Sequence, residues 1–145
     1  MGLDDPLKKM SKSAVSANNY IAMTDSADTI RDKIKRAVTD SGSEIKIAKE
    51  KPAISNLIRI FSEISDRDSE EIERDFQGKG YGDFKLALAD AMIDYLAPIQ
   101  ERYTELLSDK EELVRILKDG AEKLQPSAVQ KIADVKNKVG LGINV

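Results

Sequence analysis

The sequence predicts an all-α protein, a helical bundle preceded by an irregular N-terminal loop. Of the 145 residues, 41% are apolar and 34% are charged, a balance typical of a helical domain with its own core. Good helix formers dominate, whereas only 5% of the residues are aromatic and β-branched runs are scarce. Beyond residue 25 the apolar side chains recur at intervals of three and four. We therefore expect about four to six helices in one bundle.

The first 19 residues predict a loop. Pro6 disfavours helix at Asp5, and the serines and asparagines that follow have no apolar period. Such a start indicates either a chain that begins partway through a fold or a frayed N-terminus. Residues 20–23 are short enough for a strand or a buried turn.

A first helix is expected after Asp25 or Ser26, either of which can cap it. Its core stripe is Ile30, Ile34, Ala37 and Val38. Its basic side chains, for which a solvated face is the favoured interpretation, are Arg31, Lys33, Lys35 and Arg36. Residues 39–43 have turn chemistry, and residues 44–47 alternate as a brief extended segment would.

Two shorter helices are predicted next. Pro52 suits the first position of a helix. The apolar stripe behind it is Ile54, Leu57, Ile58, Phe61 and Ile64. Asp68 and Glu71 have the spacing of a capping box, which opens a short helix carrying Ile72 and Phe76. The glycine-rich residues 78–82 end it.

A long helix and a further one complete the chain. The long stripe is Phe84, Leu88, Ala91, Tyr95, Ile99, Tyr103 and Leu106, with a kink expected at Pro98. Asp109 is expected to cap the next helix. Its stripe is Leu113, Ile116, Leu117, Ala121 and Leu124. Pro126 either kinks this helix or starts another that runs to Val139, before a stop at Gly140 and Gly142.

Composition excludes several kinds of chemistry. The chain has no Cys and no His, which rules out disulfides, thiolate metal sites and Ser-His-Asp catalysis. The net charge is −3, but residues 1–51 carry +2, so a polyanion would more readily meet that part. No apolar stretch approaches the roughly 20 residues that a membrane helix needs, and we expect a cytoplasmic location without membrane contact.

One short motif carries chemistry: Lys9, Met10, Ser11, Lys12 and Ser13, hereafter the lysine loop. Two lysines and two hydroxyls in an irregular segment suit phosphate binding, although a solvated loop would look the same. The other candidates are weaker. Residues 78–82 lack the spacing of a phosphate-binding loop and favour a turn between helices. Arg102 with Tyr103 offers a single aromatic for stacking, and the acidic pairs at helix starts favour capping.

The motif lies in a longer stretch that resembles a known family. Residues 3–13 look like the second signature of class I aminoacyl-tRNA synthetases, as it appears in tryptophanyl enzymes. The further similar stretches follow in the expected order: residues 33–41, 51–57, 78–85 and 119–123. Two departures stand out. Ala14 occupies a place that is often acidic in the family, and the first signature, a Gly followed by His or Asn, is absent.

The resemblance implies a tryptophan–tRNA ligase, which uses ATP with Mg²⁺ to activate tryptophan and transfers it to tRNA(Trp). It implies that Lys9 and Lys12 are catalytic and that the whole lysine loop binds ATP. It also suggests Lys79, Lys85 and Arg102 as tRNA contacts. Residues 1–25 would then be the loop and its connection from the catalytic domain. Residues 26–145 would be the helical, anticodon-binding domain.

Because the first signature and the amino-acid pocket belong to a Rossmann half that this sequence lacks, we expect a C-terminal fragment that begins just before the loop. It would be inactive alone and monomeric, whereas the parent enzyme would be a homodimer. Two alternatives stay open on the sequence. One is a helical RNA- or protein-interaction module with a chance motif, and the other is a relative of the tyrosyl enzymes.

Overall fold

The computed structural model describes residues 1–142 and is all-helical over that range, which confirms the predicted fold class. No β-strand occurs among those residues. The elements are η1, a 3-10 helix (Ala17–Asn19), and the α-helices α1 (Ala27–Arg36), α2 (Pro52–Ser65), α3 (Ser69–Asp75), α4 (Tyr81–Ser108) and α5 (Lys110–Lys138). No helix of the described range is long and apolar enough to cross a membrane.

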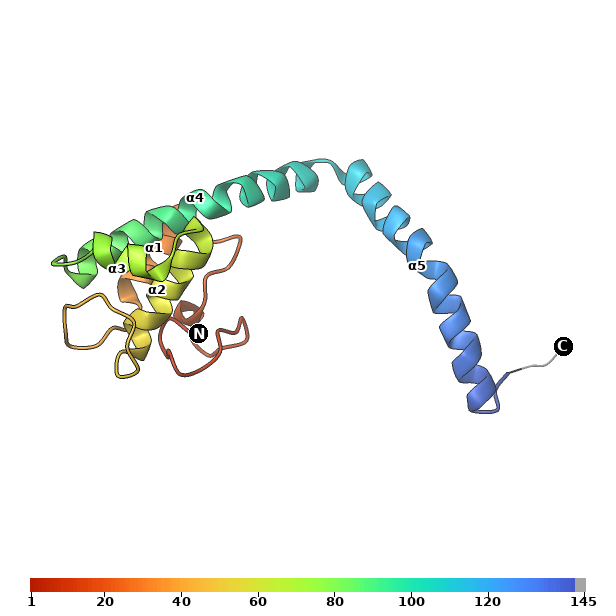
Figure 1. Cartoon of the computed structure of the whole chain (residues 1–145). Helices are drawn as coiled ribbons and strands as arrows, with labels where there is room; N and C mark the ends of the chain where they lie inside the picture. The colour runs from red at the N-terminus through yellow and green to blue at the C-terminus, as the bar shows by residue number, and fades with distance from the viewer. Residues whose placement is uncertain (143–145) are drawn as a thin grey trace. The chain divides into compact units, whose positions relative to one another are not determined.

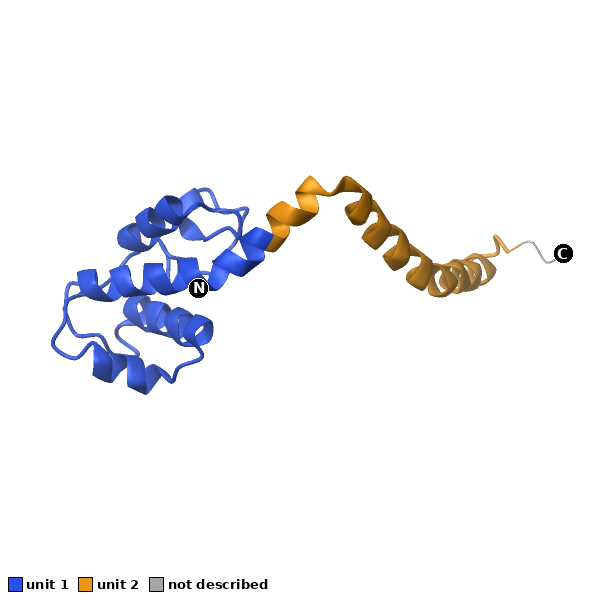
Figure 2. Ribbon diagram, turned by 90° about the horizontal axis from the view of Figure 1, so that it is seen from above, with its two compact units in different colours: residues 1–101 blue, residues 102–145 orange. Residues whose placement is uncertain are grey.

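The chain divides into two compact units, residues 1–101 and residues 102–145 (Figure 2). The first holds η1, α1, α2, α3 and most of α4, and the second holds the end of α4 and α5. The boundary predicted at residue 25 lies inside the first unit, and the division of functions on its two sides stays a prediction.

Two of the α-helices begin with a side-chain cap. Ser26 caps α1, its Oγ accepting the Thr29 N–H at 3.2 Å, and Asp109 caps α5 in the same way. Asp68 stands at the N-cap of α3 but makes no side-chain cap bond, so the predicted capping box is wrong. The other half of the box, the Glu71 carboxylate, accepts instead from Nε and Nη2 of Arg67, at 3.0 and 2.8 Å.

A single hydrophobic core lies in the first unit, where α1, α2, α3 and α4 gather beside the N-terminal segment (Figure 1). The predicted stripes of α1, α2 and α3 supply much of it. Their buried members are Ile30, Ile34, Ala37, Ile54, Leu57, Ile58, Phe61, Ile72 and Phe76. Of the other two members, Ile64 is partly buried against the core and Val38 is 44% exposed. Leu3 and Ile45 also enter the core although neither lies on a helix.

All three phenylalanines of the chain meet in this core. The ring centroids of Phe76 and Phe84 are 5.2 Å apart in an edge-on arrangement, and those of Phe61 and Phe84 are 5.8 Å apart. Phe84 is fully buried. Such ring pairs add to the hydrophobic gain of burial, and here they join α2, α4 and the end of α3.

The buried face of α4 differs from the predicted one. Its buried residues are Phe84, Leu88, Ala89, Met92 and Leu96, whereas Tyr95, Ile99 and Tyr103 are exposed. The buried row steps by four residues, the ridge along which packed helices commonly meet. Beyond Leu96 no residue of α4 is buried, so the predicted stripe continued past the end of the core.

Lys33 was expected on a solvated face and is instead buried, at 7% exposed. Its ammonium group lies 2.6 Å from the Asp25 carboxylate and 4.9 Å from the centre of the Tyr20 ring. The ion pair and the aromatic face replace the water that a buried ammonium loses. They also hold the segment before α1 against that helix.

In the second unit, α5 has no buried residue. Leu117 is 64% exposed and Leu124 is 69% exposed, so the expectation that this stripe faces a core is wrong for the described chain. An apolar stripe is buried only against a second apolar surface, and residues 102–142 offer one long helix after the end of α4. The helix runs unbroken through Pro126, so no new helix starts there.

The core accounts for the stability of the first unit, and truncating its central ring tests this. We expect Phe84→Ala to lower the free energy of unfolding by about 3–5 kcal/mol, because it removes a fully buried ring and leaves a cavity. Urea unfolding followed by circular dichroism measures the change. Leu117→Ala on exposed α5 is the matched control and should cost less than about 0.5 kcal/mol. Equal losses in the two variants would contradict the assigned core.

Candidate functional site

The lysine loop starts and ends on the helical core. Leu3 is 3% exposed, and its N–H donates to the Asn19 carbonyl at 2.9 Å. Its own carbonyl accepts the Val38 N–H, at 2.8 Å, just beyond α1. Residues 4–18 therefore begin and end at one place on the core. The N-terminal segment is thus not frayed.

Asn19 joins this root to the lysine loop itself. Its side-chain Oδ1 accepts the Ser11 N–H at 3.2 Å, and its Nδ2 donates to the Asp4 carboxylate. Asn19 is 6% exposed, so both groups of the carboxamide find partners within the protein. Gly2 makes room for it, because a Cβ at that position would lie 2.2 Å from Asn19 Nδ2.

A second buried asparagine holds the start of the chain. Oδ1 of Asn56, on α2, accepts a hydrogen bond from the Met1 ammonium at 2.8 Å. Its Nδ2 donates to the Met1 carbonyl at 3.1 Å. Neither Asn19 nor Asn56 was singled out from the sequence, since an asparagine in a loop or on a helix carries no pattern of its own.

Short polar contacts shape the lysine loop from within. The hydroxyls of Ser11 and Ser13 are 2.9 Å apart, and the Ser13 N–H donates to Ser11 Oγ at 3.3 Å. The Ala14 N–H donates to the Ser11 carbonyl at 3.1 Å, so the backbone closes a turn at the position where the family often has an acidic residue. Met10 is partly buried against the core, as expected of an apolar anchor.

The two lysines of the loop are exposed. Within residues 1–142 neither Lys9 nor Lys12 makes a hydrogen bond or an ion pair. Their neighbour Lys8 differs, since its ammonium is 2.9 Å from the Asp5 carboxylate. This contact raises the pKa of Lys8 and lowers the pKa of Asp5. The loop thus presents two uncommitted cations, with hydroxyls between and beside them, on a fixed root. Such an arrangement suits a multiply charged anion.

Comparison with known proteins gives the family. The family model of class I tRNA synthetases (W and Y) matches residues 1–97, which include the lysine loop and the whole helical core. The chain belongs to this family.

Relatives and a solved structure agree with that assignment. The chain is 46% identical to the tryptophan–tRNA ligase of Bacillus subtilis and 49% identical to that of Halalkalibacterium halodurans, with 98% of the chain covered in each case. It is similar to the crystal structure of tryptophanyl-tRNA synthetase from Mycoplasma pneumoniae, with a TM-score of 0.83 and 30% identity over 98% of the chain. The chain spans 43% of the length of the two ligases and 45% of that structure.

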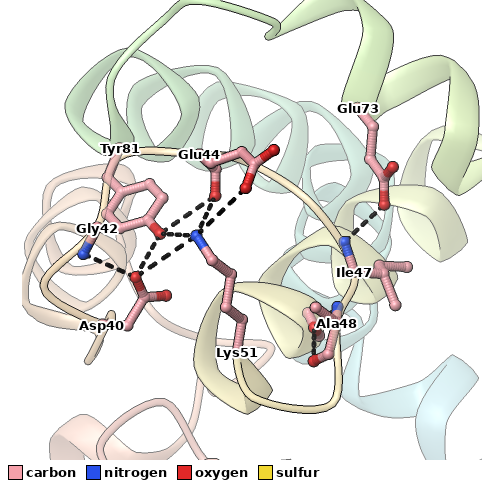
Figure 3. Close-up of polar contacts among 9 residues, drawn as sticks. Asp40, Gly42, Glu44, Ile47, Ala48, Lys51, Glu73 and Tyr81 are labelled. Atoms are coloured by element: carbon pink, nitrogen blue, oxygen red, sulfur yellow. Dashed lines mark hydrogen bonds and ion pairs between the residues drawn. The ribbon is translucent and has the colours of Figure 1, made fainter.

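Three of the synthetase-like stretches meet at one point of the first unit (Figure 3). The Tyr81 hydroxyl donates to Asp40 Oδ1 at 2.8 Å, and the Lys51 ammonium lies 3.7 Å from the same oxygen. Lys51 also donates to the Glu44 carbonyl at 3.0 Å. Tyr81 is the first residue of α4, inside the range predicted as a turn, and it packs against the core. The cluster fixes residues 38–51, which carry no helix, to the start of α4.

Residues 44–47 keep their alternation without forming a strand. Ile45 is 5% exposed, and the Ile47 N–H donates to the Glu73 carboxylate at 2.6 Å (Figure 3). The side chain of α3 thus supplies the acceptor that a neighbouring strand would have provided.

The other predicted contacts of the synthetase lie in different settings. The Lys85 ammonium donates to the carbonyls of Ala37 and Lys35, at 2.7 and 3.3 Å, so it caps the end of α1. Burial lowers the pKa of Lys85. Lys79 lies 4.8 Å from the centre of the Phe76 ring, and Arg102, in the second unit, pairs with Glu105 at 3.0 Å. Their roles toward tRNA stay predictions.

The cluster of Figure 3 predicts a pH-dependent loss of stability. Burial alone would raise the pKa of Asp40, but hydrogen bonds from Tyr81 and Gly42 and the charge of Lys51 outweigh it, and the net pKa is lowered. A carboxyl group with a lowered folded-state pKa stabilises the fold above its ordinary value, here 3.8. That contribution is lost as the pH falls through the lowered value.

Tyr81→Phe should lower the free energy of unfolding at pH 7 by about 1–2 kcal/mol, since it removes the hydroxyl from a partly buried hydrogen-bonded cluster. The acid loss should also begin at a higher pH, because the pKa of Asp40 moves back up. Urea unfolding at a series of pH values measures both effects. Tyr95→Phe, at an exposed position on the same helix, is the control. A Tyr81→Phe curve that matches the control would contradict the role of this cluster.

Proposed function

We propose that this chain is the part of a tryptophan–tRNA ligase that carries the lysine loop and the helical, anticodon-side region. The reaction joins tryptophan to ATP as tryptophanyl-adenylate with release of pyrophosphate. The tryptophanyl group then passes to tRNA(Trp) with release of AMP. The observation that carries the proposal is the pair of exposed, unpaired lysines on a fixed root, in a chain 46% identical to a named ligase over 98% of its length.

The chemistry of the first step suits such a loop. The tryptophan carboxylate attacks the α-phosphate of ATP, and negative charge grows on the leaving pyrophosphate. Positioning and charge stabilisation dominate the catalysis of phosphate chemistry of this kind. Lys9 and Lys12 would approach the leaving phosphates, and the hydroxyls of Ser11 and Ser13 would hold phosphate oxygens. Met10 would seat the loop against the core.

Mg²⁺ would enter as part of the substrate, bound to the phosphates of ATP. Among the described residues, no group of three or more acidic side chains is placed to hold a metal ion. The side chains that suit the nucleotide are instead cations and hydroxyls. Lys9 and Lys12 have no ion-pair partner among the described residues, unlike Lys8. They can therefore help the metal ion to neutralise the negative charge of the phosphates.

The rest of the chain would meet tRNA. Residues 1–25 would be the loop and its connection to a catalytic domain, and residues 26–145 the anticodon-binding region. Candidate contacts are Lys79, Lys85 and Arg102. Lys79 is the most available of them, since Lys85 already caps α1 and Arg102 pairs with Glu105. In this proposal the complete enzyme is a cytoplasmic homodimer.

A chimaera tests the proposed role of the lysine loop. This chain replaces the matching 143 residues of the Bacillus subtilis relative. We expect tryptophan-dependent ATP–pyrophosphate exchange from it, and a fall in kcat of about 10²–10³-fold on Lys12→Ala, the usual cost of losing one preorganised donor. Lys8→Ala is the matched control and should stay within about threefold, because Lys8 is already paired with Asp5.

Near-normal exchange by the Lys12→Ala chimaera would contradict the assigned role of the loop. The isolated chain should show no exchange, because its sequence lacks the first signature of the class. Robust exchange by the isolated chain would contradict the proposal that it needs a separate catalytic domain for adenylate formation.

A further inference from the structure

Asn19 lies outside the lysine loop, yet it contacts the segment at three places. Its carboxamide reaches Asp4, before the loop, and Ser11, at the centre of the loop. Its carbonyl accepts the N–H of Leu3, a core residue. One buried residue thus links the core, through its carbonyl, with the segment before the loop and the backbone between the two exposed lysines, through its carboxamide.

The geometry demands both halves of a carboxamide. Oδ1 must accept, because it faces the Ser11 N–H at 3.2 Å, and Nδ2 must donate, because it faces the Asp4 carboxylate. Aspartate has nearly the same shape but no donor. At position 19 it would place two carboxylates against each other in a site that is 6% exposed. A buried polar group that loses its hydrogen-bond partner destabilises a protein far more than an exposed one does.

Resting on the proposed function, we propose that Asn19 is a positioning residue for pyrophosphate release. It holds the Ser11 backbone to the core, and this fixes the directions in which Lys9 and Lys12 leave the chain. Met10 anchors the same turn by packing on the core. The two lysines therefore lie on either side of a backbone segment that is held both by Asn19 and by the packing of Met10. Asn19 touches no reacting atom in this scheme. It acts by keeping the loop in the arrangement that the leaving phosphates require.

The chimaera described above provides the kinetic test. Asn19→Asp should lower kcat for pyrophosphate exchange roughly 10- to 100-fold, the scale of a misplaced catalytic group. The KM for tryptophan should change by less than about twofold, because the loop handles phosphate. Asn18→Asp is the matched control. It makes the same chemical change at the exposed neighbouring residue and should leave kcat within about twofold.

A second substitution separates positioning from general damage. In the double variant Asn19→Asp with Asp4→Asn, the new amide at position 4 donates to the new carboxylate at position 19. That carboxylate still accepts the Ser11 N–H. The net charge equals that of the original chain. We expect kcat to recover to within about threefold of the unsubstituted chimaera, because the hydrogen bond between positions 4 and 19 is restored with its donor and acceptor exchanged, and the bond from Ser11 is kept.

Trypsin gives a readout that needs no synthetase activity, and it uses the 145-residue chain itself. Cleavage after Lys9 and Lys12 requires the loop to open from its root. Asn19→Asp should raise the cleavage rate about tenfold, and the double variant should return it to the original value. Cleavage after Lys131, in exposed α5, should not change and serves as the internal control.

The outcomes distinguish the two proposals. An inactive unsubstituted chimaera would overturn the proposed function. An active one whose Asn19→Asp variant keeps its kcat, or whose double variant fails to recover it, would overturn the role of Asn19 alone. Trypsin cleavage at an unchanged rate in Asn19→Asp would also overturn that role, because the loop would then not be held by this residue.

Discussion

The insertion of Leu3 into the helical core is the interaction on which the architecture of the N-terminal unit depends. Leu3 is 3% exposed, its N–H donates to the Asn19 carbonyl, and its carbonyl accepts the Val38 N–H. Because it is fixed, the irregular residues 4–18 form a loop with a common root instead of a tail. The lysines are therefore carried by the same core that packs α1, α2, α3 and α4.

The sequence predicted the helices and, for α1, α2 and α3, the faces that pack on the core. Apolar spacing located the stripes of α1, α2 and α3, since each of these helices has one face on the core. The spacing could not show where the core ends. Along α4 the burial stops at Leu96, and α5 carries an apolar stripe although none of its residues is buried in the part of the chain that the structure describes. Periodicity reports that a helix has an apolar face, and only tertiary structure decides whether that face is covered.

In the candidate site, the residues with charged or hydroxyl groups could be predicted from the sequence, whereas the residues that hold them in place could not. Two lysines and two serines in an irregular stretch, with a methionine to seat them, could be found by inspection. Asn19 could not, because its role comes from the partners that folding brings to it. Lys33 was misjudged for a related reason, and the capping contact of Lys85 could not be foreseen either. The sequence alone does not show whether a lysine side chain contacts water, a buried carboxylate or the carbonyls at the end of a helix.

Amide hydrogen exchange tests most directly the claim that the lysine loop is rooted in the core. The N–H of Leu3 and the N–H of Ser11 both donate to Asn19. The account predicts that both exchange at least about 100-fold more slowly than the N–H of Lys12, and that Leu3 approaches the protection of the amides of α2. Exchange of Leu3 and Ser11 as fast as that of Lys12 would show a free N-terminal segment and contradict the account.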